Sequence, residues 1–70
     1  MKTTYVALST AAASAWRKYG GPSERAVYMA IYRAYDKGEI QGAQRREGAK
    51  IKLNRDSLDA WLALEYPEAA

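Results

Sequence analysis

The clearest helix signals in the chain lie in residues 21–38, which read GPSERAVYMAIYRAYDKG. Gly21 can serve as the N-cap, and Pro22 suits the first helical position because its missing N–H would have no partner there. Gly38 suits the left-handed residue that ends many helices, since it has no Cβ. These signals predict a helix that starts at Pro22 and ends before Gly38. Its apolar stripe, at the spacing of one helix face, consists of Val27, Ala30, Ile31 and Ala34.

Two further helices are predicted, one on either side of this one. The first covers residues 10–19, with Ser9 as its N-cap and a glycine pair directly after it. The last covers residues 55–66, with Asn54 as its N-cap and Pro67 ending it. Their apolar faces are Ala12, Ala15, Trp16 and Tyr19 in the first helix, and Leu58, Trp61 and Leu62 in the last.

The remaining segments favour extended structure. Residues 3–8 are rich in strand formers and predict a short strand. Residues 39–53 alternate loosely and contain two glycines, which predicts a β-hairpin with Ile51 and Leu53 facing inward. The fold class expected for residues 1–70 is therefore α+β, mainly helical, in a single domain. The expected core is Leu8, Trp16, Val27, Ile31, Ile40, Ile51, Leu53, Leu58, Trp61 and Leu62.

The composition argues against several kinds of site. The chain has no cysteine and no histidine, which excludes disulfides, thiolate and imidazole metal ligands, and catalysis by a histidine base. Asp56 and Asp59 are typical of the first turn of a helix rather than of a catalytic pair. We expect no enzyme, metal, cofactor or small-molecule ligand. No apolar run approaches the roughly 20 residues of a membrane span, and the N-terminus does not resemble a signal peptide, so we expect a soluble intracellular protein.

Charge is distributed unevenly along the chain. Residues 1–55 hold all eleven lysines and arginines and four acids, for a net charge of +7, whereas residues 56–70 hold four acids and no base, for −4. Five of the bases fall within residues 45–55, RREGAKIKLNR. The simplest polyanion to meet this basic region is a nucleic-acid backbone. The alternative is a solvated basic hairpin that has no partner.

The second helix carries a mixture of arginine, tyrosine and methionine on the side away from its apolar stripe: Arg25, Tyr28, Met29, Tyr32 and Arg33. Arginine can form two hydrogen bonds with the major-groove edge of guanine, tyrosine can bond a phosphate, and methionine can touch a thymine methyl. These residues therefore fit a major groove. The alternative is that some of the tyrosines pack against the hairpin or the first helix, and Tyr35, at the edge of the stripe, is the best candidate for that role.

Four cations straddle the expected turn at Gly48: Arg45, Arg46, Lys50 and Lys52. Alternation along the strand places the two lysines on the outer side of the hairpin. A hairpin lying along DNA can insert its tip into a minor groove or hold the flanking backbone. Each phosphate that it neutralises adds about −0.9 to the slope of log affinity against log salt.

Three segments resemble a known group of DNA-binding domains. Residues 31–40, IYRAYDKGEI, resemble the segment V-Y-R-L-I-x-x-G-E-L that closes the recognition helix of excisionases and MerR-like winged-helix proteins. Residues 51–62, IKLNRDSLDAWL, resemble the hairpin exit and final helix of that family, close to I-R-R-x-D-L-x-x-W-L. Residues 5–10, YVALST, stand where the family often has Y-L-T-T.

The resemblance implies a small winged helix-turn-helix fold: three helices with a two-stranded hairpin as the wing. Its recognition helix, residues 22–36, would enter the major groove, and its wing, residues 41–53, would touch the neighbouring minor groove and backbone. The DNA-contacting residues implied by position are Ser23, Arg25, Tyr28, Met29, Tyr32 and Arg33 in the helix, and Arg45, Arg46, Lys50 and Lys52 in the wing.

A domain of this size without a following coiled coil resembles an excisionase of a phage or mobile element. The resemblance implies an architectural double-stranded DNA-binding protein in the bacterial cytoplasm, associated with the nucleoid. It would bind repeated sites cooperatively, bend attachment DNA and direct a tyrosine-family integrase toward excision. One alternative is a small winged-helix transcriptional regulator. Another is a protein-interaction module that uses the tyrosines of the second helix or the acidic last helix, although the acids of that last helix are also explained by solvation alone.

Overall fold

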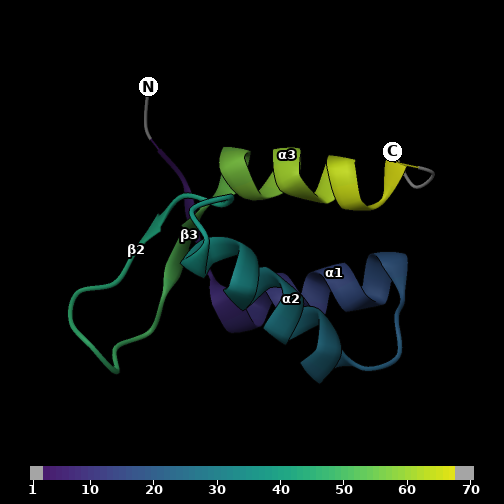
Figure 1. The fold of residues 1–70 in the computed structure, drawn as a ribbon, viewed down its shortest axis with the longest axis horizontal. Coiled ribbons are helices and arrows are strands. Elements are labelled where there is room, and N and C mark those ends of the chain that lie inside the picture. The colour runs from purple at the N-terminus through teal and green to yellow at the C-terminus, as the bar shows by residue number, and fades with distance from the viewer. Residues whose placement is uncertain (1–2, 68–70) are drawn as a thin grey trace.

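The computed structural model describes residues 3–67. Its three helices and three short strands confirm the expected α+β, mainly helical class (Figure 1). The helix-turn-helix pair is followed by a hairpin and then by the last helix, in the expected order. The elements are β1 (Tyr5–Ala7), α1 (Leu8–Tyr19), α2 (Glu24–Asp36), β2 (Gly42–Ala43), β3 (Lys52–Asn54) and α3 (Arg55–Glu65).

The three strands form one antiparallel sheet in the order β1-β3-β2. Tyr5 pairs with Asn54 on one side of β3, and Gly42 pairs with Leu53 on the other. The predicted N-terminal strand is thus confirmed, although it is shorter than residues 3–8, and it makes the hairpin part of a larger sheet. Because β1 leads directly into α1 and β3 directly into α3, the sheet sets the start of both helices.

Helix α1 presents small residues to the rest of the molecule. Its buried residues are Leu8, Ala11, Ala12 and Ala15, and alanines allow another helix to approach closely. Trp16 was expected in the core but is 39% exposed. It lies one residue beyond the buried stripe, at the turn into α2, where its ring edge would be 3.9 Å from a Cβ added to Gly21.

The predicted cap of α1 is wrong. The helix begins at Leu8, and its N-cap is Ala7, which makes no side-chain cap bond. The reason is that β1 runs into the helix without a loop. The Leu8 amide donates to the carbonyl of Ile51 (3.0 Å), so the chain passes directly from sheet pairing into the helix and Ser9 is already the second helical residue.

Helix α2 starts two residues later than predicted, because Ser23 rather than Gly21 is its N-cap. The Ala26 amide donates to Ser23 Oγ (3.1 Å), a bond that glycine has no side chain to make. The end of the helix is as predicted: Gly38 has φ 84°, and the Glu39 amide donates back to Ala34 (2.8 Å), which is a Schellman ending. Val27, Ile31 and Ala34 are buried as expected, whereas Ala30 is exposed.

Helix α3 is capped and buried as predicted. The Ser57 amide donates to Asn54 Oδ1 (3.0 Å), and Ser57 Oγ in turn accepts from the Gln41 amide (2.8 Å). At the far end of the helix, the rings of Tyr19 and Tyr66 stack with centroids 4.5 Å apart and join α3 to α1. Helix α3 is therefore held at its start by the cap and the sheet, and at its end by the tyrosine stack.

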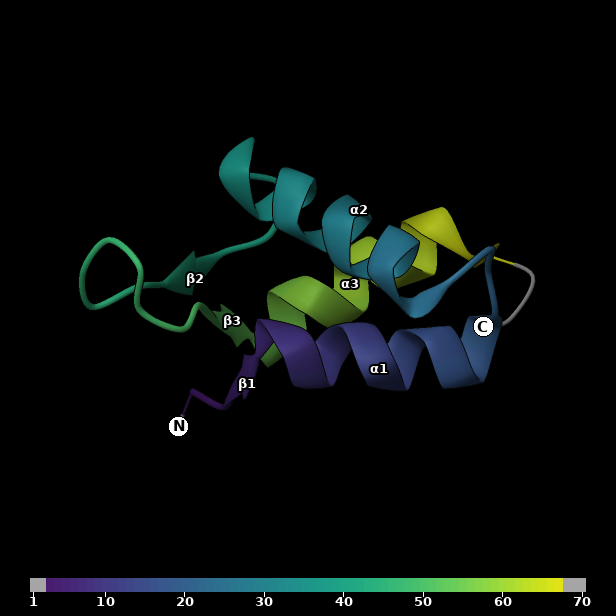
Figure 2. The ribbon, with the colours of Figure 1, turned by 90° about the horizontal axis from the view of Figure 1, so that it is seen from below.

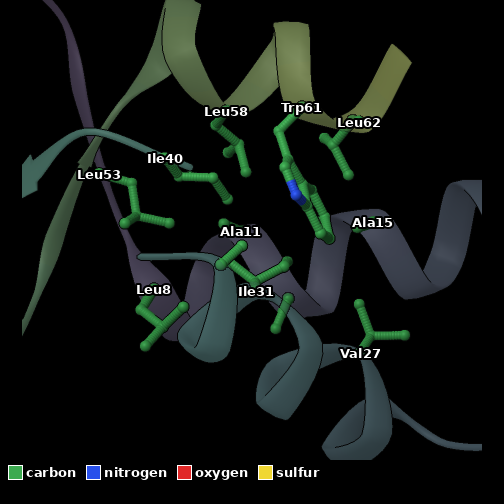
Figure 3. Close-up of a cluster of buried hydrophobic side chains, with 12 residues drawn as sticks. Leu8, Ala11, Ala15, Val27, Ile31, Ile40, Leu53, Leu58, Trp61 and Leu62 are labelled. Carbon is green, nitrogen blue, oxygen red and sulfur yellow. The ribbon is translucent and has the colours of Figure 1, made fainter. Parts of the chain in front are cut away.

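The core lies between α1, α2 and α3, with Leu53 of the sheet at one side of it (Figure 3). Trp61 is nearly buried at its centre, and its indole Nε1–H donates to Glu39 Oε1 (3.3 Å). Ile51, expected in the core, is only half-buried against it. Among residues 3–67, no helix is both long and apolar enough to cross a membrane. The buried apolar residues are Leu8, Ala11, Ala12, Ala15, Val27, Ile31, Ala34, Ile40, Leu53, Leu58, Trp61 and Leu62.

The two tryptophans should differ in their effect on stability. Trp61→Ala removes a buried ring and is expected to lower the unfolding free energy by about 3–5 kcal/mol, whereas Trp16→Ala, at a half-open site, should cost well under half as much. Urea denaturation followed by circular dichroism at 25 °C measures both. Equal losses would contradict the burial described here. If Trp61→Ala does not fold, the same order is expected for Trp61→Phe and Trp16→Phe.

Gly42 should tolerate no side chain. A Cβ there would lie 2.6 Å from the backbone oxygen of Lys52 and 3.0 Å from the ring of Tyr35, so β2 would have to shift away from β3. We expect Gly42→Ala to lower the unfolding free energy by about 1–3 kcal/mol. Its urea midpoint should fall below that of Ala43→Ser, a change at the exposed neighbouring position. An unchanged midpoint for Gly42→Ala would show that the strand pair is not this close.

Candidate nucleic-acid interface

The outer side of α2 is open, and most of the residues predicted to contact DNA lie on it. Arg25 and Arg33 are exposed, and Met29 is half-buried. Tyr28 and Tyr32 are 37% and 38% exposed, so they do not belong to the core. Tyr35 is half-buried and packs against the core. This agrees with the alternative prediction that one of the tyrosines packs instead of facing outward. Ser23 is exposed; its oxygen caps the helix, and its hydroxyl hydrogen can still be donated.

The three tyrosines of α2 follow one edge of the helix, next to the buried stripe. They are spaced by four and three residues, so they share a side. Tyr28 borders a hollow with the start of α1 and with Lys50 of the wing, and the ring of Tyr35 approaches Gly42 of β2. The tyrosine edge of α2 therefore comes close to the wing at Tyr28 and at Tyr35.

The wing is built on a tight turn. The Ala49 amide donates to the Arg46 carbonyl (3.0 Å), and Gly48, third in the turn, has φ 85°. Gln44 Nε2 also donates to the Ala49 carbonyl (2.7 Å), which ties the two sides of the loop together. This confirms the predicted turn across residues 47–49, although the paired strands are shorter than the sequence suggested.

All four cations predicted for the wing are exposed. Three of them, Arg45, Lys50 and Lys52, line one hollow of the wing together with Ala43 and Ala49. Arg46 lies at the start of the turn. Positive charge is therefore concentrated on one side of the hairpin and at its tip.

Lys50 connects the wing to α2. It lines the wing hollow with Arg45 and Lys52, and it also lines a second hollow, of about 220 Å³, where the start of α1, helix α2 and the wing meet. We call this second one the α2–wing hollow; its lining residues are Ala7, Leu8, Ser9, Tyr28, Lys50 and Ile51. The aromatic edge of α2 and the cationic side of the wing thus border on one another.

The acidic helix lies away from this surface. In Figure 1, α3 runs along the upper edge of the molecule, while the loop of the wing and the first turn of α2 reach its lower side. Figure 2 shows the wing projecting beyond the ends of the helices. The acids of α3 therefore lie on a different side of the molecule from the loop of the wing.

The two parts of the candidate interface differ in charge. Helix α2 is neutral, because two arginines are balanced by Glu24 and Asp36. The wing, with four bases and Glu47, carries +3. Attraction to a polyanion must come mainly from the wing, whereas α2 offers shape and hydrogen-bonding groups.

Sequence reasoning missed one member of this surface. Ser9 was expected to cap α1, but it is exposed and lines the α2–wing hollow. On the other side of α1, a different hollow lies between α1 and α3, with Thr10, Lys18, Arg55 and Asp59 among its lining residues. Within residues 3–67, no group of three or more carboxylates is arranged to hold a metal ion.

The comparisons with known proteins found no match, so any functional conclusion rests on the fold and on these surfaces. No protein-family model matches the chain, and neither the curated proteins nor the solved structures include a significant match to it.

Proposed function

We propose that this chain is a sequence-specific architectural protein that binds double-stranded DNA, of the type that excisionases represent. Helix α2 would enter the major groove and the wing would contact the adjacent minor groove and backbone. The observation that supports this most directly is the position of Lys50, which joins the aromatic edge of α2 to the cations of the wing. The acidic α3 lies away from that surface.

Each exposed group has a chemical counterpart on duplex DNA. The guanidinium groups of Arg25 and Arg33 can each donate two hydrogen bonds to a guanine edge, and Tyr32 can donate to a phosphate. The wing supplies the salt-dependent attraction, because its cations displace counterions from the backbone. In this division of roles, α2 selects the sequence and the wing supplies most of the affinity.

A single module of this size buries only about 600–1,000 Å² of protein surface on DNA. We therefore include in the proposal that several copies bind repeated sites cooperatively and that together they bend the DNA. A bend of 40–90° costs on the order of 1–6 kcal/mol, which several copies can supply. Such a protein would direct a tyrosine-family integrase toward excision on the nucleoid, in the cytoplasm of a bacterial host.

A small transcriptional regulator would share this DNA-binding surface and is the second candidate. A protein-interaction module that uses the tyrosine edge of α2 is the third, because Tyr28 and Tyr32 are exposed. The first two differ in the DNA that they bind: tandem sites beside a recombination site indicate an excisionase, and an isolated promoter palindrome indicates a regulator. The third is tested by the response to salt.

Removing the charge of the wing should reduce the salt dependence of duplex binding. With Arg45, Arg46, Lys50 and Lys52 all changed to Gln, the slope of log affinity against log salt is expected to become shallower by about 3 to 4, because four phosphate contacts are lost. Fluorescence anisotropy with a 30-bp duplex across a salt series measures this. The control is Arg17→Gln with Lys18→Gln on α1, which should leave the slope within about 0.5 of the original. Equal binding by the wing variant and the unaltered protein at every salt concentration would favour the protein-interaction module.

The architectural role predicts a stepwise response on attachment DNA. In a gel-shift titration on phage attachment DNA, we expect successive complexes of increasing bend, and a further slow complex when integrase is added. Circularly permuted fragments of the same DNA report the bend. A single complex with no bend, unaffected by integrase, would exclude the excisionase role while leaving duplex binding intact.

A further inference from the structure

We propose that the α2–wing hollow holds one DNA backbone phosphate, and that Ser9 is a DNA-contacting residue. The phosphate would belong to the strand that separates the major groove occupied by α2 from the minor groove occupied by the wing. This rests on the proposed function, because it assigns a place on DNA to a site between the two DNA-binding elements.

The groups around the hollow suit a phosphate. Three of the lining residues carry hydrogen-bond donors (Ser9, Tyr28 and Lys50), the other three are apolar, and none is acidic. Hydroxyls and ammonium groups donate hydrogen bonds to phosphate oxygens. The hollow between α1 and α3 also has a lysine and an arginine on its rim, but Asp59 lines it too, and its carboxylate would repel the same ligand.

The floor of the hollow is held in place by the sheet. Ala7 pairs with Lys52, and the Leu8 amide donates to the Ile51 carbonyl (3.0 Å). Residues from the start of α1 and the end of the wing are therefore fixed relative to one another before any ligand binds. A preformed site of this kind loses little conformational entropy on binding.

Ser9 is free for this role because capping does not need it. The N-cap of α1 is Ala7, with no side-chain cap bond, and the Ile51 carbonyl accepts the hydrogen bond of the first helical amide, that of Leu8. The Ser9 side chain, on the second residue of the helix, is exposed beside Tyr28 and Lys50. A serine that looks like a helix cap in the sequence is thus placed on the DNA-facing surface.

The location follows from duplex geometry. A phosphate strand lies between any major groove and the minor groove next to it, so a protein that inserts one element into each groove must pass that strand between them. Two hollows are lined by residues of both α2 and the wing: the α2–wing hollow, and another that includes Tyr35, Gln41 and Gly42. The second also has Asp36 on its lining, and a carboxylate there would repel a phosphate. The strand that both elements straddle would therefore meet Ser9, Tyr28 and Lys50 together.

Three variants with matched controls test the assignment. Ser9→Ala, Tyr28→Phe and Lys50→Gln each remove one polar group of the hollow. Thr10→Ala, Tyr5→Phe and Lys18→Gln remove the same groups elsewhere: Thr10 and Lys18 line the hollow between α1 and α3, and Tyr5 lies on β1. All six residues are exposed, so thermal melting should show all six variants folded. The probe is a duplex selected by the unaltered protein from a randomised library, ethylated at single phosphates to neutralise them one at a time.

In all three hollow variants, ethylation of one and the same phosphate should weaken DNA binding less than it does in the unaltered protein. Ethylation of that phosphate should weaken the unaltered protein but have little further effect on Lys50→Gln, whose salt slope should also fall by about 0.9. Ser9→Ala and Tyr28→Phe should each bind about threefold to tenfold more weakly and show reduced interference at that phosphate. The controls should keep the original pattern.

The possible results distinguish a failure of the phosphate site from a failure of the proposed function. If the unaltered protein selects no duplex, both fail. If it binds duplex DNA but the three variants affect different phosphates, or Ser9→Ala behaves like Thr10→Ala, the proposed function stands and the phosphate site is wrong.

Discussion

Strand β3 is the constraint on which the rest of the structure depends. Its three residues pair with β1 on one side, two of them also pair with β2 on the other, and the next residue begins α3. Leu53, at its centre, is fully buried and links the sheet to the helical core. Through these contacts β3 fixes where α1 starts, where α3 starts and how the wing leaves the body. The relation of the wing to α2, on which any binding surface between them rests, is therefore set by a very short piece of sheet.

The division of charge between α2 and the wing has a functional meaning under the proposed role. A neutral α2 gains little from the backbone unless its side chains match the bases, so its binding energy depends on sequence. A wing of charge +3 is attracted to any duplex. Combining the two allows weak, general association to bring a selective helix to its site.

Much of the fold could be predicted because the decisive signals are local. The Schellman glycine after α2, the asparagine cap of α3 and the turn at Gly48 each act within a few residues, and all three are where the sequence placed them. The errors arise where tertiary contacts prevail. Ser9 does not cap α1 because β1 runs directly into the helix and makes Ser9 its second residue, and Trp16 is exposed because the alanines before it take the buried positions.

The candidate site shows the same contrast. The exposure of Lys50 and Lys52 could be predicted from alternation, since alternate residues of a hairpin face outward, and that of Arg45 and Arg46 from their place beside the turn at Gly48. The approach of Lys50 to Tyr28 and Ser9 could not, because it depends on the pairing of segments that are about forty residues apart in the chain. Side-chain chemistry was thus predictable from the sequence, but which groups share one surface required the fold.

The shortness of the outer strands has a further consequence. A protruding cationic hairpin would be hazardous if its edges offered long rows of unpaired amides and carbonyls, since another chain could add to them and start a fibre. Here β1 has three residues and β2 has two, and the paired segment ends before the loop that carries both arginines. The projecting arm therefore offers almost no template for strand addition, and copies crowded side by side on a polymer can remain separate molecules.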